Sequence, residues 1–146
     1  MVLDCIASGA VWVSMRDLGV DVLISAPQKG WSAPPAAGLV MFSPEGLARL
    51  EATTSDSFAL DLKKWRAIMK AYEDGGHAYH ATMPTDGLRQ FRDTVQEMKA
   101  FGFGKAQDAQ WELGRQVRSL LAYLPLNNRA ASPLGADTGV GADPQA

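Results

Sequence analysis

Three short apolar runs in the first third of the chain restrict its fold more than any other feature. They cover residues 2–6, 21–25 and 38–43, and each is followed by small residues, proline or a polar loop. Runs of this length, bounded by turn-forming residues, are typical of buried strands, because a helix usually needs about ten residues or more. Residues 13–19, between the first two runs, allow one or two helical turns that Gly19 would end. We therefore predict three strands that deliver loops at their ends.

After residue 43 the apolar spacing becomes helical. Ser43 is a predicted N-cap, and the proline and glutamate that follow it suit the first turn of a helix that runs to about residue 51. Apolar residues three and four apart predict further helices over 60–73, 84–101 and 104–124. The predicted apolar faces consist of Leu62, Trp65, Met69 and Tyr72, then Leu88, Phe91, Val95 and Met98, then Leu113, Val117, Leu120 and Leu124. Short strands joined by a helical segment, as in residues 2–25, are typical of an α/β fold.

Charge, hydropathy and cysteine content indicate which kinds of partner and which cellular compartment to expect. A formal net charge of -2 without a basic block argues against nucleic-acid binding. The longest apolar stretches are far shorter than the roughly 20 residues of a membrane span, so we expect no membrane partner. Cys5 is the single cysteine and no export signal is visible, which favours a cytoplasmic location. Residues 125–146 contain proline and glycine but no aromatic residue, and we expect a disordered tail there.

Two charged residues lie next to the ends of predicted strands. Asp4 is a charge within an apolar run, where a buried carboxylate requires a cation or strong donors. Lys29 follows the second strand in a loop of small residues and prolines, which is where open α/β sheets place ligand sites. The structural alternatives are an ion pair of Asp4 with Lys29 or Arg16, and a solvated loop lysine. Both residues are candidates for a binding site.

Other polar residues make weaker candidates. His77 and His80 are three residues apart, but no carboxylate or third ligand stands at suitable spacing, so we predict no metal site. Ser8 and Ser32 lack the context of a serine nucleophile. We interpret Cys5 as a small buried residue, because the neighbouring carboxylate raises the pKa of a thiol.

Four blocks of sequence resemble one family of enzymes. In chain order, they are Leu3-Asp4-Cys5-Ile6-Ala7-Ser8, Gly19-Val20-Asp21-Val22-Leu23, Ser25-Ala26-Pro27-Gln28-Lys29-Gly30 and Ala78-Tyr79-His80-Ala81-Thr82-Met83-Pro84. The blocks resemble the class V, fold-type I aminotransferases that use pyridoxal phosphate, above all the alanine:glyoxylate and serine:glyoxylate (serine:pyruvate) group. The resemblance covers about residues 2–122. It implies that 1–101 form the C-terminal part of the cofactor-binding large domain and that 102–124 begin the small domain, with 125–146 unrelated to the family.

The resemblance also implies roles for individual residues. Lys29 falls on the lysine that forms a Schiff base with the cofactor and then acts as general base. Gln28 falls on the residue beside the cofactor. Asp4 falls on the carboxylate that pairs with the pyridine nitrogen, and Ile6 on the apolar residue under the ring. Together these residues imply the cofactor pyridoxal 5'-phosphate.

The implied reaction is transamination between a small amino acid, alanine or serine, and a 2-oxo acid, glyoxylate or pyruvate. Tyr79 and Thr82 fall on positions that, in the family, reach the cofactor phosphate of the neighbouring subunit. The resemblance therefore implies a homodimer. Two alternatives stay open. One is a lyase or desulfurase-like enzyme of the same class, and the other is a non-enzymatic remnant that at most pairs with a full-length paralogue.

Parts of the family pattern have no counterpart in this sequence. The resemblance includes neither the N-terminal phosphate-binding loop and ring-stacking aromatic residue nor the C-terminal arginine that grips the substrate carboxylate. We therefore expect a fragment truncated at both ends. Because each missing group normally contributes to binding or catalysis, we expect negligible transamination by the isolated chain.

Overall fold

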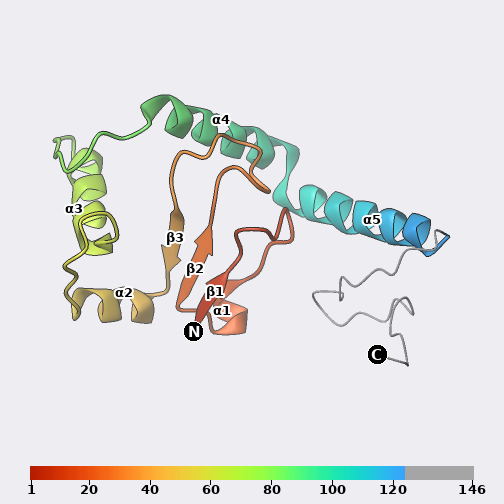
Figure 1. The fold of residues 1–146 in the computed structure, drawn as a ribbon, viewed down its shortest axis with the longest axis horizontal. Helices are drawn as coiled ribbons and strands as arrows, with labels where there is room; N and C mark the ends of the chain where they lie inside the picture. Colours follow the sequence, from red (N-terminus) through yellow and green to blue (C-terminus); the bar gives the residue numbers. More distant parts are fainter. Residues whose placement is uncertain (124–146) are drawn as a thin grey trace.

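The computed structural model describes residues 1–123, which form a three-stranded sheet and five helices (Figure 1). The elements are β1 (Val2–Asp4), α1 (Met15–Leu18), β2 (Val22–Ser25), β3 (Leu39–Phe42), α2 (Pro44–Glu51), α3 (Leu62–Glu73), α4 (Thr85–Phe101) and α5 (Phe103–Ala122). The predicted α/β class, the three strands and the helices are confirmed. The predicted tail 125–146 and Leu124 lie outside the described residues.

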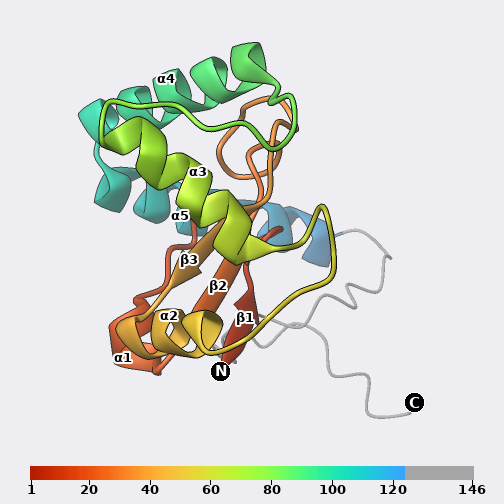
Figure 2. The same cartoon turned by 90° about the vertical axis from the view of Figure 1, so that its left-hand side faces the viewer.

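The sheet has the order β1-β2-β3, with β1 and β2 parallel and β3 antiparallel to β2. Asp4 is paired with Ile24, and Ser25 with Leu39. A parallel pair needs a crossover connection, and here the segment that contains α1 supplies it. The carboxyl ends of β1 and β2 therefore meet at one end of the sheet, near α4, while α2 lies at the other end (Figures 1 and 2).

The first strand is exposed, which corrects the prediction of a buried strand. Val2 is 66% exposed, whereas Leu23 and Ser25 of the central strand are buried. The reason is position, because β2 has a neighbour on each side, whereas β1, like β3, is an edge strand of the sheet formed by residues 1–123. The local sequence of β1 is as apolar as that of β2 and cannot reveal this difference.

The helix ends follow the predicted local signals. The Ser43 hydroxyl accepts a hydrogen bond from the Gly46 amide at 3.0 Å, and a proline occupies the first turn of α2. The Ser14 hydroxyl caps α1 in the same way, at 3.2 Å from the Asp17 amide. Gly19 ends α1 with φ 64°, a left-handed conformation that glycine adopts without steric cost.

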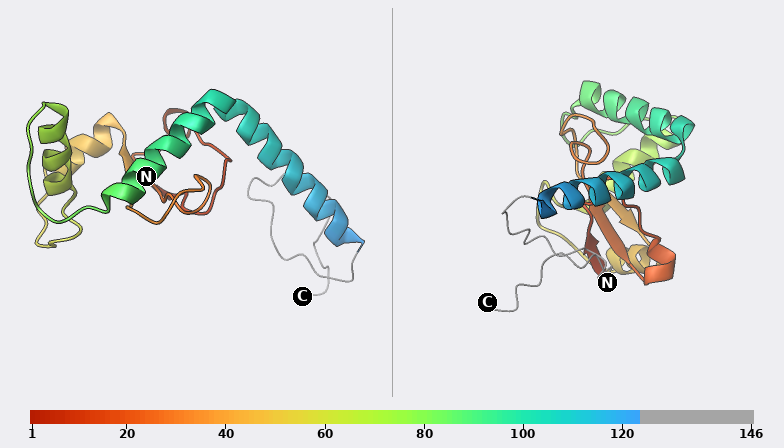
Figure 3. Two further views of the ribbon diagram at one scale, coloured as in Figure 1. Left: turned by 90° about the horizontal axis from the view of Figure 1, so that it is seen from above. Right: turned by 90° about the vertical axis from the view of Figure 1, so that its right-hand side faces the viewer.

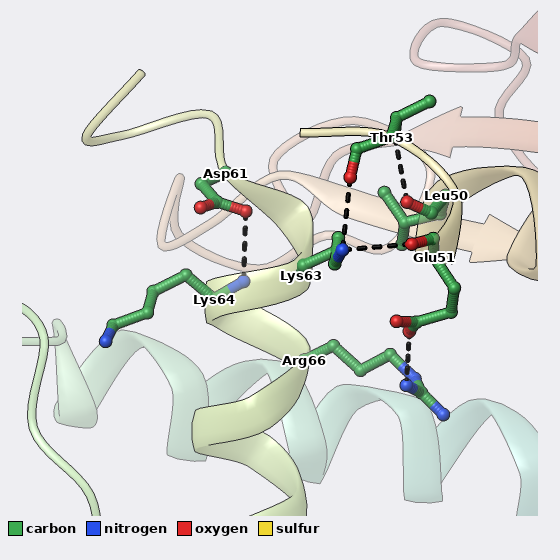
Figure 4. Close-up of polar contacts among 7 residues, drawn as sticks. All are labelled: Leu50, Glu51, Thr53, Asp61, Lys63, Lys64 and Arg66. Carbon is green, nitrogen blue, oxygen red and sulfur yellow. Dashed lines mark hydrogen bonds and ion pairs between the residues drawn. The ribbon is translucent and has the colours of Figure 1, made fainter. Parts of the chain in front are cut away.

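A lysine of α3 satisfies the carboxyl end of α2 (Figure 4). The Lys63 ammonium donates to the carbonyl oxygens of Glu51 and Thr53 at 3.0 and 3.1 Å. Arg66, one turn further along α3, forms an ion pair of 2.6 Å with the Glu51 carboxylate. The last carbonyls of a helix lack partners within the helix and carry a partial negative charge, so a cation is favourable there. These contacts join α2 to α3.

We expect Lys63→Met to lower the free energy of unfolding by about 1 kcal/mol, because two carbonyls lose a charged donor. Lys64→Met is the matched control, since the exposed Lys64 contributes only its backbone amide, to Asp61 at 3.1 Å. Urea unfolding of both variants measures the difference. Equal midpoints for the two variants would contradict the capping role.

The predicted apolar faces have different surroundings. The face of α4 is half-buried, as predicted, but Met69 of α3 and Leu113 of α5 are 64% and 55% exposed. In α3 the buried residue is Ile68, which the predicted face omitted. Helix α5 contacts α4 near its start and then extends away from the sheet (Figures 1 and 3). Consequently, nothing within residues 1–123 covers most of its apolar side chains.

Residues 1–123 contain no helix that is both long and apolar enough to cross a lipid bilayer.

Candidate active site

Two loops at the carboxyl ends of β1 and β2 form the candidate site. The first, 5–14, follows Asp4, and the second, 26–38, carries Lys29. Their backbones meet at two glycines, since a Cβ atom placed on Gly30 would lie 2.4 Å from the Gly9 carbonyl oxygen. Only glycine permits so close an approach. The contact therefore holds the loop after Asp4 against the loop that carries Lys29.

The backbone around Lys29 forms a tight turn. The Ser32 amide donates to the Lys29 carbonyl at 3.1 Å, and the Ala33 amide donates to the Pro27 carbonyl at 3.0 Å. Pro27 is fully buried, whereas Gln28 and Lys29 are exposed. Within residues 1–123, Lys29 is therefore a solvated loop lysine. The backbone of the loop is anchored, and the Lys29 side chain extends from it into solvent.

Asp4 is exposed rather than buried, which is a second correction. Its carboxylate accepts a hydrogen bond from the Ile6 amide at 2.8 Å, and the half-buried Ile6 follows it in the same loop. Within residues 1–123, Asp4 forms no ion pair with Lys29 or Arg16. The cause is again the edge position of β1, which leaves one side of this strand without a covering element. A charge at the end of an exposed strand needs no buried partner.

Cys5 lies between Asp4 and Ile6 in the sequence and is half-buried. Burial, and then the Asp4 carboxylate, raise the pKa of the Cys5 thiol above its ordinary value, while a hydrogen bond involving Ser8 partly opposes them. The effect of Asp4 follows from its place next to Cys5 in the sequence, whereas the larger effect of burial depends on the fold. A thiol with a raised pKa is a poor nucleophile at neutral pH, which disfavours a cysteine-dependent desulfurase.

Tyr79 and Thr82 come from a different segment, between α3 and α4. Their hydroxyls lie 3.2 Å apart, and the Tyr79 side chain is 77% exposed. His80 anchors this segment, because its ring lies 4.2 Å from that of Phe58 and 5.0 Å from that of Trp65. Its Nε2 atom is also 2.8 Å from the Phe58 carbonyl oxygen. Two hydroxyl groups are thus presented side by side on the surface, away from the packed ring of His80.

The two loops pack on α4 and α5 through an aromatic cluster that the sequence did not predict as part of the site. The ring of Trp31 lies 5.0 Å from Trp12, 5.8 Å from Phe91 and 6.5 Å from Phe103. Trp12 also donates from its indole to the Phe103 carbonyl at 2.9 Å. Both tryptophans lie in loops, and their spacing in the sequence does not indicate that they meet α4 and α5. The cluster ties both site loops to these helices.

The arrangement offers a primary amine and a carboxylate on neighbouring loops. An amine can bond covalently to a carbonyl carbon, and a carboxylate can stabilise a protonated ring nitrogen. No group of three or more histidine, cysteine, aspartate or glutamate residues within 1–123 is arranged to hold a metal ion. A hollow lined by Val22, Phe42 and Leu50 lies at the amino end of β2, opposite the Lys29 loop, and the amine and carboxylate that border it, those of Met1 and Asp21, form an ion pair with each other.

No family model matches the chain, but its relatives among known proteins include several aminotransferases and soluble hydrogenase subunits. An alanine–glyoxylate aminotransferase of Oryctolagus cuniculus is 31% identical over 121 residues, which are 80% of this chain and 29% of that relative. A soluble hydrogenase small subunit of Synechococcus is 28% identical over 132 residues, which are 90% of this chain and 33% of that relative. The chain therefore spans about a third of the length of these relatives.

A solved structure shares the fold. An alanine–glyoxylate aminotransferase from Nostoc superposes with a TM-score of 0.73 at 20% identity, over 86% of this chain and 33% of that chain. The mixed three-stranded sheet and its helices thus match part of an aminotransferase fold. Together, the aminotransferase relatives and this shared fold support a class V aminotransferase, of which the chain contains about a third of the length.

Proposed function

We propose that this chain supplies the lysine-bearing part of a pyridoxal phosphate site for transamination between alanine or serine and a 2-oxo acid, glyoxylate or pyruvate. The observation that carries the proposal is that Asp4 ends β1 and Lys29 lies in the loop after its parallel neighbour β2, while the loops after these two strands touch at Gly9 and Gly30. Aminotransferase relatives support the reaction class. Because the chain spans about a third of their length, the complete reaction requires the remainder of the fold.

The chemistry of these side chains fits the cofactor. Lys29 provides an exposed amine for the aldehyde, and Asp4 provides a carboxylate for the ring nitrogen. Ile6 offers an apolar surface for the ring, and Gln28 is an exposed amide next to Lys29. When bound, pyridoxal phosphate supplies an electron sink that stabilises negative charge at the substrate Cα. The donor set is thus that of a cofactor with an aldehyde and a basic ring.

Lys29 has two tasks in this proposal. Its amine first holds the cofactor covalently, and after the substrate has displaced it, the same amine takes the proton from the substrate Cα. Both tasks need a neutral amine, which a desolvated environment favours. Since Lys29 is exposed within residues 1–123, that cover has to come from the rest of the fold. The isolated chain is therefore expected to bind cofactor through Lys29 but to catalyse almost no transamination.

We also propose that Tyr79 and Thr82 hold the cofactor phosphate of a second subunit in a homodimer. Support comes from the exposure of Tyr79 and from the two hydroxyls that lie 3.2 Å apart, so that both can donate to one phosphate group. His80 fixes the backbone between them. Within residues 1–123 the two hydroxyls bond to each other and not to the Lys29 loop, so the phosphate in this proposal belongs to the partner subunit.

The domain division remains part of the proposal. Gly102, with φ 106°, separates α4 from α5, which supports a large-domain part that ends near residue 101 and a small domain that begins at 102.

The cellular compartment is also part of the proposal. The single cysteine supports a reducing, cytoplasmic compartment.

Mapping the covalent attachment of the cofactor tests this proposal. The chain is incubated with pyridoxal phosphate and reduced with borohydride, and the labelled peptide is identified by mass spectrometry. We expect the label on Lys29 and its loss in Lys29→Arg, because the guanidinium cannot form the same bond. A label confined to the other lysines would reject Lys29 as the attachment residue. These are Lys63, Lys64, Lys70, Lys99 and Lys105.

A further inference from the structure

A hydrogen bond between two side chains brackets the part of the loop that carries Lys29. The Trp31 indole donates to the Ser25 hydroxyl at 3.3 Å. Ser25 is the last residue of β2 and is buried, so it provides a fixed acceptor at the start of the loop. Lys29 lies between these two anchors. The bond therefore shortens the free segment that carries the amine to residues 26–30.

The ring of Trp31 is itself held by other segments. It packs against Trp12 at 5.0 Å and meets the edge of Phe91 at 5.8 Å. Trp12 is fixed in turn, because its indole donates to the Phe103 carbonyl at 2.9 Å and its own carbonyl accepts from Gln107 at 3.2 Å. Aromatic contacts of this kind contribute about 0.5–1.5 kcal/mol each beyond the area that they bury. The anchor thus rests on α4 and α5 and not on the loop alone.

The backbone next to Trp31 is strained. Ser32 has φ 55°, the left-handed region, and it is the only residue within 1–123 other than glycine with a positive φ. Such a conformation costs an L-residue about 1–2 kcal/mol and persists where surrounding contacts fix it. The amide of Ser32 closes the turn on the Lys29 carbonyl. Trp31 and this turn therefore determine the direction in which Lys29 leaves the backbone.

We propose that Trp31 is a positioning residue for Lys29, acting through its bond to Ser25 and its packing on Trp12. The proposal rests on the proposed function of Lys29 and deepens it. Without the anchor, the loop ends separate and the amine samples more positions. Its attack on a bound aldehyde then becomes slower, because fewer of these positions are productive.

Two variants test the anchor by removing one half of the bond each. Trp31→Phe keeps an aromatic ring but loses the donor, and Ser25→Ala loses the acceptor without changing the ring. Trp65→Phe is the matched control, because it removes an indole hydrogen bond of 2.8 Å to the Ala59 carbonyl, outside the Lys29 loop. Hydrogen exchange of the full chain is measured at the Ser32 and Ala33 amides. We expect about fivefold faster exchange in both test variants, as for the loss of one hydrogen bond, and no change in the control.

A second readout uses pyridoxal phosphate and borohydride on the same chains. The rate of labelling at Lys29 is divided by the rate at the exposed Lys64, which provides an internal reference. We expect this ratio to fall severalfold in Trp31→Phe and Ser25→Ala and to stay constant in Trp65→Phe. If the effect came from a general loss of stability, the labelling ratio would fall in Trp65→Phe as well.

The possible outcomes separate this inference from the proposed function. Unchanged exchange at Ser32 and Ala33 in both variants would overturn the positioning role, even if the wild-type label lies on Lys29. Suppose instead that the Ser32 and Ala33 amides exchange faster in both variants, but pyridoxal phosphate does not label Lys29 preferentially in the wild-type chain. This result would support the anchor and reject the proposed function. If Trp31→Phe does not fold, Ser25→Ala decides alone.

Discussion

Replacing Asp4 by asparagine is expected to slow proton transfer by about a hundredfold or more in a complete site, the scale on which removal of one electrostatic group affects catalysis. The carboxylate favours the protonated ring nitrogen, and the neutral amide does not, so the ring becomes a weaker electron sink. The measurement needs the whole fold. A suitable protein is a chimera in which residues 2–122 replace the matching segment of the Nostoc aminotransferase, whose fold this chain shares.

The control for this substitution is Asp17→Asn. Asp17 is an exposed aspartate in α1, on the segment between β1 and β2, and its backbone amide rather than its carboxylate bonds to Ser14. Cofactor binding is followed by absorbance, and turnover of alanine with glyoxylate by product formation. We expect Asp4→Asn to retain the cofactor and lose turnover, while Asp17→Asn retains both. Turnover near that of the unsubstituted chimera would count against the role of Asp4.

Gly30→Ala is expected to lower the free energy of unfolding by about 3 kcal/mol, at the upper end of the cost of overpacking. The added Cβ would lie 2.4 Å from the Gly9 carbonyl oxygen and 2.6 Å from the Gly9 Cα. Both atoms belong to the backbone, so no side-chain rotation relieves the clash. The loops after β1 and β2 would have to separate, and the preference of pyridoxal phosphate for Lys29 would fall with them.

Gly38→Ala is the matched control in the same loop. A Cβ atom at Gly38 meets nothing within 4 Å, and its φ is not positive. Alanine there restricts the unfolded chain and is expected to be neutral or to stabilise by up to about 1 kcal/mol. Urea unfolding of the two variants gives the comparison. Coincident transitions would show that the two loops do not depend on the contact between Gly9 and Gly30.

The termini of the elements could be predicted because short-range chemistry sets them. Ser43 and the following proline place the start of α2, and Gly19 places the end of α1, through contacts within four residues. Burial could not be predicted in the same way. The apolar sequences of β1 and β2 look alike, yet their order in the sheet leaves Val2 exposed and Leu23 buried.

The candidate site likewise has features that the sequence predicts and features that depend on tertiary contacts. The sequence alone singled out Lys29 and Asp4, because a charge at the end of an apolar run is a local pattern and the four family blocks are contiguous. The contact of Gly9 with Gly30 and the bond of Trp31 to Ser25 depend on the pairing of β1 with β2 and on the turn that follows. The packing of Trp12 on the start of α5 joins residues 91 positions apart. Such contacts were decided only by the tertiary structure, because they follow from how the elements pack and not from the spacing of residues along the chain.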